Sequence, residues 1–387
     1  MADGAPRDAA AELPGYARDD NKAALLSVGA SGTIYALVMP ESENALQYVV
    51  DGCDKDALVG NPDALSVLDG ARRREWLSRF HEPWTQKQDD AHVAYLDGWV
   101  RWAAPVVAVD AAAFAHRYPT AGASEAIFKL MAEYASASQA AGGAPTIHVF
   151  EGEYEGFAAL AASLSIKVVR HRRDRWRDAI GAIDRDGQFW ISQPSAIDGG
   201  VWADFGAFAH AMAAARPDVS IVPDLSYVGA VAREYLIPLD FANVPAFVVS
   251  HSKPFGGYYH RVGGVYAREI RPSLFGNRWF KNLTSLAWGV EMMRRHDVFD
   301  LPRRYAHVQA AAARDVGRRL GVNDLRPADV FLLGVAPPPS DPAPAVASAI
   351  RGVGADRVLR LCLTPTMAAM ACPASAPGIM SLLGSPS

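Results

Sequence analysis

The sequence predicts an α/β protein with a mostly parallel central sheet covered by helices. Through the middle of the chain, short runs rich in β-branched residues alternate with alanine-rich stretches of helical character, which is the pattern of strand–helix–strand units. The chain has 387 residues and is 50% hydrophobic, enough to bury a large core and to form two structural lobes. We therefore expect one large α/β domain and a smaller second lobe.

Each expected element corresponds to one such run. The predicted strands are 146–150 (TIHVF), 166–169, 188–192 (QFWIS), 219–223, 246–250 (AFVVS) and 262–267. The predicted helices lie near 124–140, 155–163, 204–215 and 282–294. The first helix is expected to begin at Ser124, a residue type favoured as an N-cap, followed by Glu125.

The predicted domain boundaries follow from these elements. We expect an N-terminal arm and small-lobe segment at 1–59, a large ligand-binding domain at 60–285 and a small C-terminal domain at 286–387. The proline-rich stretch APPPSDPAPA (336–345) follows a strand-like VFLLGV and precedes VLRLCLT, so it is predicted to be a surface loop of the smaller lobe.

Composition narrows the class of partner. With 38 Lys and Arg against 42 Asp and Glu, the net charge of -4 gives no electrostatic reason to expect nucleic acid or an anionic membrane, and a small-molecule substrate is the better expectation. Cys53, Cys362 and Cys372 lack metal-type spacing, and reduced thiols in a cytoplasm are expected rather than disulfides. No run approaches the ~18 apolar residues of a membrane span, and the start reads as a mobile arm rather than a signal peptide.

Chemically active side chains follow several predicted strands. Asp224 closes the strand SIVPD, Lys253 follows AFVVS by three residues, residues 151–154 follow TIHVF, and the turn PTAGAS (119–124) leads into a helix. Ligands of an open parallel sheet collect at the carboxyl ends of its strands. Four loops from separate regions of the sequence are therefore expected to converge there.

The turn before the helix at Ser124 predicts a phosphate site. The first N–H groups of a helix have no intrahelical partner, and Gly122 and Ala123 let an anion come close to them. Arg261 adds a planar positive charge that suits phosphate, and Ser250 adds a hydroxyl. A glycine before a helix is also common in ordinary packing, so Gly122 alone does not establish such a site.

Lys253, in SHSKPFGGYYHRVGG (250–264), is the candidate nucleophile. A lysine in a partly dry pocket loses some of its preference for the charged form and can form a Schiff base. For a pyridine-ring cofactor, Asp224 would keep the ring nitrogen protonated, Tyr227 would reach the ring oxygen and Tyr154 would lie against the ring face. Taken singly, a turn aspartate, a core tyrosine and a surface lysine explain the same residues.

Together these motifs resemble the fold-type I pyridoxal phosphate enzymes, in particular the class I/II aminotransferases. TAGASEAI (120–127) is similar to the phosphate-cup motif of that family, DLSY (224–227) to its Asp-x-x-Tyr, and SHSK with an arginine eight residues after the lysine is the most specific match. The matches extend from Thr120 to Arg360. The resemblance implies a three-layer α/β/α large domain with a mostly parallel sheet and a smaller C-terminal α+β domain.

The resemblance also implies a role for each matching residue. Gly122, Ala123, Ser124, Ser250 and Arg261 would bind the cofactor phosphate, Asp224 the ring nitrogen and Tyr227 the ring oxygen, while Lys253 would form the Schiff base. Tyr154, in EGEYEGF, takes the place of the stacking aromatic, and Arg360, in VLRLCLT, resembles the arginine that holds the α-carboxylate of the substrate.

One departure concerns the ring oxygen. The family has an Asn-Pro-Thr-Gly turn where this chain reads ISQPSAIDGG (191–200), and Ala196 stands in place of the asparagine. This leaves the ring oxygen to Tyr227, with Gln193 or Ser195 as further candidates, unless Ala196 packs directly on the cofactor. The change makes transamination by the usual route less certain.

The implied function is amino-acid metabolism by a cytoplasmic, aminotransferase-like homodimer that depends on pyridoxal 5'-phosphate. The alternative is β- or γ-elimination, replacement or cyclisation in biosynthesis, on an amino acid such as S-adenosylmethionine or an arginine derivative. A non-catalytic cofactor-binding module stays open, although the set Lys253, Asp224 and Arg261 argues against it. A nicotinamide dehydrogenase ranks low because no GxGxxG follows an early strand.

Four remaining features have competing interpretations. RHRRDRWRD (170–178) is expected to be a solvated face rather than an acidic-group site. FGNRWFKNL (275–283) either lines the pocket entrance, contacts a second subunit or packs between domains. His251 and His260 are expected to be structural donors rather than proton carriers. Trp84, in HEPW, is a candidate to reach the active site of a partner subunit across a dimer interface, and no role is assigned to it.

Overall fold

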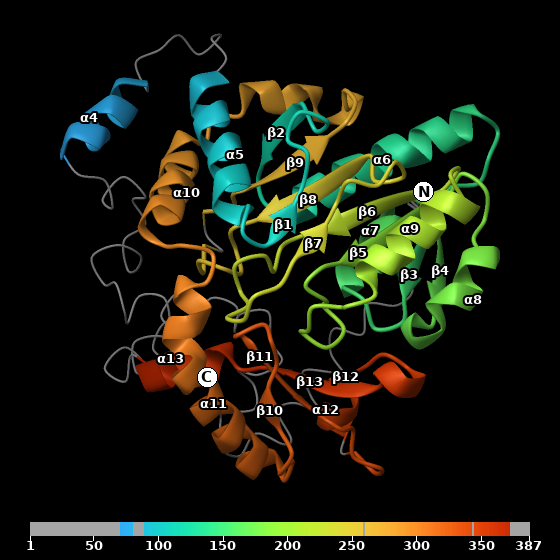
Figure 1. The fold of residues 1–387 in the computed structure, drawn as a ribbon, viewed down its shortest axis with the longest axis vertical. Helices are drawn as coiled ribbons and strands as arrows, with labels where there is room; N and C mark the ends of the chain where they lie inside the picture. The colour runs from blue at the N-terminus through green and yellow to red at the C-terminus, as the bar shows by residue number, and fades with distance from the viewer. Residues whose placement is uncertain (1–69, 80–88, 258–259, 343, 372–387) are drawn as a thin grey trace, which may run out of the picture.

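The structure is a computed structural model that describes residues 70–79, 89–257, 260–342 and 344–371 (Figure 1). The predicted arm at 1–59, Trp84, Cys53 and Cys372 lie outside these residues. None of the helices within the described ranges is long and apolar enough to cross a membrane.

A seven-stranded sheet forms the centre of the molecule, in the strand order β2-β9-β8-β6-β5-β3-β4. Its strands are β2 (His116–Thr120), β3 (Thr146–Phe150), β4 (Lys167–His171), β5 (Gln188–Ser192), β6 (Ser220–Asp224), β8 (Ala246–Ser250) and β9 (Gly263–Ala267). All pairs are parallel except the two that β9 makes, with β2 and with β8. The mostly parallel sheet and all six predicted strands are confirmed, with bounds shifted by no more than two residues.

Helices cover both faces of this sheet because side chains alternate along each strand. In β5, Phe189 and Ile191 belong to one core, which they share with the helix α9 (Phe205–Ala215). Trp190, between them, belongs to a second core together with the helices α6 (Ala123–Ala140) and α7 (Glu155–Ser163). The result is a three-layer α/β/α arrangement (Figure 1).

Phe208 of α9 should be among the residues whose loss is most costly to stability. Its side chain is fully buried, and its ring lies edge to face with Phe189, at 4.9 Å between centroids. Phe208→Ala removes this packing and leaves a cavity, so we expect the free energy of unfolding to fall by about 3–5 kcal/mol. Urea unfolding measures it, with Leu236→Ala as a control at a side chain that is 59% exposed. A loss below that of the control would contradict the packing role.

A second sheet of four short antiparallel strands lies beside the first, in the order β10-β11-β13-β12. Its strands are β10 (Arg326–Pro327), β11 (Leu333–Ala336), β12 (Ile350–Arg351) and β13 (Val358–Cys362). The proline-rich stretch connects β11 to the short helix α12 (Pro344–Ala347) before β12. The predicted domain boundaries stay a prediction. The predicted end of the large domain, residue 285, falls inside the helix α10 (Leu283–Arg295), which packs against α5 (Asp89–Ala103).

The remaining elements surround the two sheets. They are the helices α4 (Gly70–Ser78), α8 (Trp176–Gly181), α11 (Asp300–Leu320) and α13 (Thr364–Ala371), the parallel strand pair β1 (Val107–Ala108) and β7 (Ile237–Pro238), and the 3₁₀ turns η4 (Arg173–Arg175), η5 (Pro272–Trp279) and η6 (Gly354–Asp356). α11 and α13 pack against each other beside the second sheet.

The expectation of a solvated face at 170–178 is wrong for part of that run. Arg173 is only 5% exposed, and its guanidinium forms ion pairs with Asp198 and Asp356. Trp176 is also buried. Alternating charges in the sequence do not reveal partners that lie 25 and 183 residues away, and such partners make the burial of a charge tolerable.

Candidate active site

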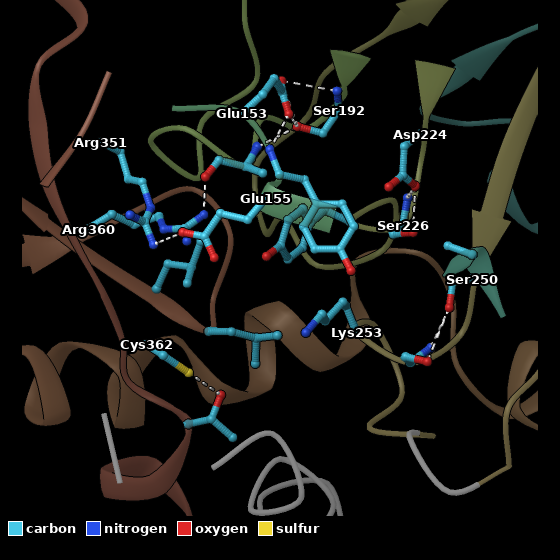
Figure 2. A pocket seen from close by; sticks show the side chains of 18 of the residues that line it. Glu153, Glu155, Ser192, Asp224, Ser226, Ser250, Lys253, Arg351, Arg360 and Cys362 are labelled. Atoms are coloured by element: carbon cyan, nitrogen blue, oxygen red, sulfur yellow. Dashed lines mark hydrogen bonds and ion pairs between the residues drawn. The ribbon is translucent and has the colours of Figure 1, made fainter. Parts of the chain in front are cut away.

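A pocket of about 480 Å³ opens at the carboxyl ends of the parallel strands, between the central sheet and the second sheet. Ser192, Asp224 and Ser250, the last residues of β5, β6 and β8, line it from the central sheet. Arg351 and Arg360 line it from β12 and β13. Figure 2 shows Lys253 between the two arginines on one side and Asp224 and Ser250 on the other.

The structure brings together most of the residues predicted from the sequence. Those that line this pocket are Ala123, Ser124, Tyr154, Asp224, Tyr227, Ser250, Lys253, Arg261 and Arg360. Gly122 and Ser195 do not line it. The convergence of loops expected from the strand ends is therefore present, while the role of each side chain stays a prediction.

The amino end of α6 differs from the expectation in its first residue. Ser124 is not the N-cap: the helix begins at Ala123, and Gly122 occupies the cap position with φ 85° and no side-chain hydrogen bond. A positive φ suits glycine, which explains why the turn ends there. Ser124 instead lies in the first helical turn and lines the pocket. With no side-chain cap among the described residues, the first N–H groups of α6 are left for a ligand.

Because Gly122 has no side chain, the guanidinium of Arg261 can lie close to this turn. A Cβ atom on Gly122 would lie 2.9 Å from Nη2 of Arg261, and one on Gly263 would lie 2.9 Å from Cα of Gly122. Arg261 itself has a φ of 48° and donates from Nη2 to the carbonyl of Ala121, at 3.2 Å. The two glycines let the turn, the arginine and the start of β9 come together without side chains between them.

Asp224 is a buried carboxylate with a cation nearby. It is 5% exposed, and its Oδ1 accepts hydrogen bonds from the backbone N–H of Ser226, at 3.0 Å, and from the Ser226 hydroxyl, at 2.5 Å. Burial raises the pKa of Asp224, while these hydrogen bonds and the charge of Lys253 oppose the rise. The bond to Ser226 N–H also fulfils the turn role that was the simpler alternative.

The two tyrosines enter the pocket from different loops. Tyr154 is the N-cap residue of α7, is 42% exposed and lies edge to face with Phe157, at 5.4 Å between ring centroids. Its ring lies over Gly156, where any Cβ atom would collide with it. Tyr227 is half-buried, and its ring packs against the core that β5 shares with α9.

The arginines of the second sheet form one wall. Arg360 donates from Nη1 to the carbonyl of Ala196, and no carboxylate within the described ranges forms an ion pair with it. Arg351 pairs with Glu155 at 2.5 Å and donates to the carbonyl of Ser348 at 3.0 Å. Burial and the charge of Arg360 lower the pKa of Arg351. This wall is therefore positively charged and can bind an anion.

Sequence reasoning missed Glu153, Arg351 and Cys362 as pocket residues. Glu153 lay within the loop expected at the end of β3, so its position was a usable signal. Arg351 and Cys362 have no local signal, because only the pairing of β12 with β13 brings Arg351 beside Arg360.

The residues near the missing asparagine either line the pocket or bind other parts of the protein. Ala196 lines the pocket. Ser195 turns away, and its hydroxyl accepts from Arg173 at 3.0 Å. Gln193 also turns away, since its side-chain amide binds both backbone polar groups of Trp202. Of the candidates for a ring oxygen, Tyr227 is thus the one that reaches the pocket.

The histidines beside the lysine lie outside the pocket lining. His251 is fully buried and shares a hydrogen bond of 2.7 Å with the Tyr95 hydroxyl, and burial lowers its pKa to about 3. His260 stacks on Trp288 at 4.3 Å, and burial lowers its pKa to about 4. Both are neutral at pH 7, as structural residues would be. The segment 275–283 does not line the pocket either.

Glu153 should give the protein a measurable pH dependence. Its carboxylate is 7% exposed and accepts from the Ser192 hydroxyl at 2.7 Å and from the backbone N–H of Tyr154 at 2.9 Å. Burial raises its pKa from 4.5 to about 7. Between these values the native state holds a proton that the unfolded state has lost, so stability should fall as pH rises from about 4.5 to about 7 and then level off.

The ligand-free Glu153→Gln variant tests this. The free energy of unfolding of both proteins is measured by urea unfolding from pH 4 to pH 8. As pH rises, the wild type should lose on the order of 3 kcal/mol of stability relative to the variant. A difference that does not change with pH would show that the carboxyl ionises normally.

No protein-family model matches the chain, and no curated protein matches it. Solved structures do. An aspartate aminotransferase double mutant from Thermus thermophilus is 15% identical, with a TM-score of 0.56 over 87% of this chain and 95% of that one. A methionine aminotransferase from Escherichia coli is 15% identical, with a TM-score of 0.55 over 78% and 88%. A histidinol-phosphate aminotransferase from Sinorhizobium meliloti, solved with pyridoxal 5'-phosphate, is 15% identical, with a TM-score of 0.52 over 82% and 88%.

At this identity the likeness establishes the fold, and it covers most of both chains in each comparison. The chain therefore has the fold of the fold-type I, class I/II aminotransferases, as its motifs predicted.

Proposed function

We propose that this protein is a pyridoxal phosphate-dependent enzyme that acts on an amino acid, with an aminotransferase-like reaction as the best-supported activity. One observation carries the proposal: Lys253 and the buried Asp224 meet in one pocket with an uncapped helix terminus and Arg261. A lysine that shares a pocket with a buried carboxylate and the amino end of a helix suits an aldehyde cofactor that carries a phosphate.

The residues present fit that cofactor. The N–H groups of α6, Ser124, Ser250 and Arg261 would hold the phosphate, because the three side chains line the pocket and Arg261 donates to the carbonyl of Ala121 in the turn before α6. Asp224 would pair with the ring nitrogen, with Ser226 holding its carboxylate in place. Tyr227 would donate to the ring oxygen, and Tyr154 would cover one face of the ring.

When bound, pyridoxal phosphate supplies an electron sink that stabilises negative charge at the α-carbon of the substrate. With cofactor and substrate bound, Nζ of Lys253 would take the α-proton and act as the general base. Arg360 binds the α-carboxylate in a bidentate pair and so orients the α-carbon toward that nitrogen. The second sheet lines the pocket with Arg351 and Arg360.

Absorbance tests the proposal. The protein mixed with pyridoxal phosphate should develop a visible band that survives dialysis, and an amino-acid panel should convert the cofactor to pyridoxamine phosphate, detected by chromatography. A protein that stays colourless contradicts the proposal as a whole. Consumption of amino acids without pyridoxamine phosphate contradicts transamination and favours elimination, replacement or cyclisation. A stable band with no amino acid consumed favours a non-catalytic binding module.

We also propose that two copies pair through the face that carries α5 and η5. Val93, Ile270 and Phe275 are each more than half exposed and line one surface hollow of about 540 Å³. Exposed apolar side chains grouped in this way are typical of an interaction surface. Light scattering after size exclusion should report a dimer, and Phe275→Asp should shift it toward the monomer. A monomeric wild type would refute the pairing.

The location of the protein in the cytoplasm stays a prediction.

A further inference from the structure

Arg173 is a buried arginine that does not line the pocket. It binds two segments that lie next to the pocket arginine Arg360: the turn η6 that precedes β13 and the turn 195–198. It begins the turn η4 and is 5% exposed. Its Nη1 donates to the Ser195 hydroxyl at 3.0 Å, and its Nη2 donates to Asp198 Oδ2 at 2.6 Å and to Asp356 Oδ1 at 2.8 Å. One guanidinium thus serves three partners from two parts of the chain.

The first of these parts carries the pocket arginines. Asp356 ends η6, the turn between β12, which carries Arg351, and β13, which carries Arg360. The same turn is held by a second contact from η4, because Asp174 Oδ2 accepts from the backbone N–H of Ala355 at 3.0 Å. The connection between the two arginine-bearing strands is therefore fastened to the central domain through η4.

The second part carries the backbone group that Arg360 binds. Ser195 and Asp198 flank Ala196, whose carbonyl accepts from Nη1 of Arg360. The Ser195 hydroxyl also accepts from the N–H of Ile197 at 3.1 Å, and the Ser195 carbonyl accepts from Gly199 N–H at 2.9 Å, so the turn is closed on itself. Arg173, which does not line the pocket, therefore holds this turn through Ser195 and Asp198.

We propose that Arg173 is a positioning residue for Arg360: it sets the distance between β13 and the Ala196 turn, and so aims the Arg360 guanidinium at the substrate carboxylate. The proposal rests on the function proposed above. A planar guanidinium with a fixed fork can hold three acceptors at once, whereas the ammonium of a lysine has no such geometry. Arg173→Lys should therefore keep the charge and lose the alignment.

The expected effect is selective. A misplacement of about 1 Å at a positioning group can cost about 10²-fold, so the apparent Kd and KM for an amino acid should rise by about tenfold or more in Arg173→Lys. The affinity for pyridoxal phosphate and its visible band should not change, because Arg173 does not contact the cofactor pocket. Asp356→Asn should reproduce the effect more weakly, since it removes only the contact to η6.

The experiment uses spectral titration of the cofactor-loaded protein with L-alanine, L-aspartate, L-phenylalanine and L-arginine. Arg216→Lys is the matched control, because Arg216 also forms a two-pronged pair with an aspartate, Asp218, but is the C-cap residue of α9 and does not line the pocket. Hydrogen exchange of the cofactor-free protein provides a second measurement: backbone amides of 195–200 and 350–360 should exchange faster in Arg173→Lys, and those of 246–250 should not.

The outcomes separate the two proposals. A rise in amino-acid Kd with an unchanged cofactor band, together with faster exchange in both segments, supports the positioning role. Faster exchange with unchanged Kd and KM shows that Arg173 is merely structural and overturns the inference. Unchanged exchange also overturns it. A wild-type protein that binds no cofactor, or responds to none of the four amino acids, refutes the proposed function instead.

Discussion

Lys253→Ala should abolish covalent attachment of pyridoxal phosphate and lower turnover by at least about 10²–10⁴-fold, the usual range for loss of a positioned proton-transfer group. No other lysine lines the pocket within the described ranges, so no second amine stands ready to replace it. Borohydride reduction followed by mass spectrometry should find the cofactor mass on the peptide that contains residue 253 in the wild type, and no labelled peptide in the variant.

A matched control separates this effect from a general loss of positive charge. Lys167, the first residue of β4, is mostly exposed and pairs with Asp184. The Lys167→Ala variant should therefore retain the colour, the labelling and the turnover of the wild type. If borohydride fixed the cofactor to another lysine in Lys253→Ala and turnover stayed intact, Lys253 would not be the attachment site. Phosphate contacts from α6 and Arg261 should still hold the cofactor non-covalently in the variant.

Arg360→Ala should weaken amino-acid binding by about 10²-fold while cofactor binding survives. A bidentate guanidinium–carboxylate pair contributes two charge-assisted hydrogen bonds, each worth about 1.5–3 kcal/mol. Among the described residues no carboxylate forms an ion pair with Arg360, whose side chain donates to the carbonyl of Ala196. The spectral Kd for the best amino acid of the panel measures the loss, and the visible band of the cofactor provides the internal reference.

The neighbouring Arg357 is the control for that variant. It follows η6 in the same connection and is exposed, so Arg357→Ala should leave the spectral Kd unchanged. If Arg360→Ala instead released the cofactor, the arginine would serve the structure through its bond to Ala196 rather than the substrate. Equal losses in both variants would point to a general electrostatic effect of the second sheet.

The sequence predicted the strands that are buried on both faces because their composition is decisive on its own. TIHVF and AFVVS are almost entirely apolar or β-branched, and each became a fully buried strand. The edge strand β2 was not predicted, since HRYPT contains polar residues and Pro119, which strands tolerate mainly at an edge. The positions of Asp224, Lys253 and Tyr154 at strand ends followed from the strands themselves.

What the sequence could not provide are partners far apart in the chain. Ser124 satisfies every local rule for an N-cap, yet Gly122 takes that position, where Arg261 and Gly263 press against it. Arg173 looked like one charge among many until the structure placed Asp198 and Asp356 around it. Arg351 became a pocket residue only through the register of β12 against β13. Each depends on tertiary packing that no local pattern encodes.

The reversed direction of β9 explains the spacing of the lysine motif. β8 ends at Ser250 and β9 begins at Gly263, and because the two strands are antiparallel, the chain leaves and re-enters the sheet at the same edge. Lys253 and Arg261 both lie in the sequence between the end of β8 and the start of β9. A change in the number of residues between Lys253 and Arg261 is therefore expected to alter the spacing of their two charges while β8 and β9 keep their register.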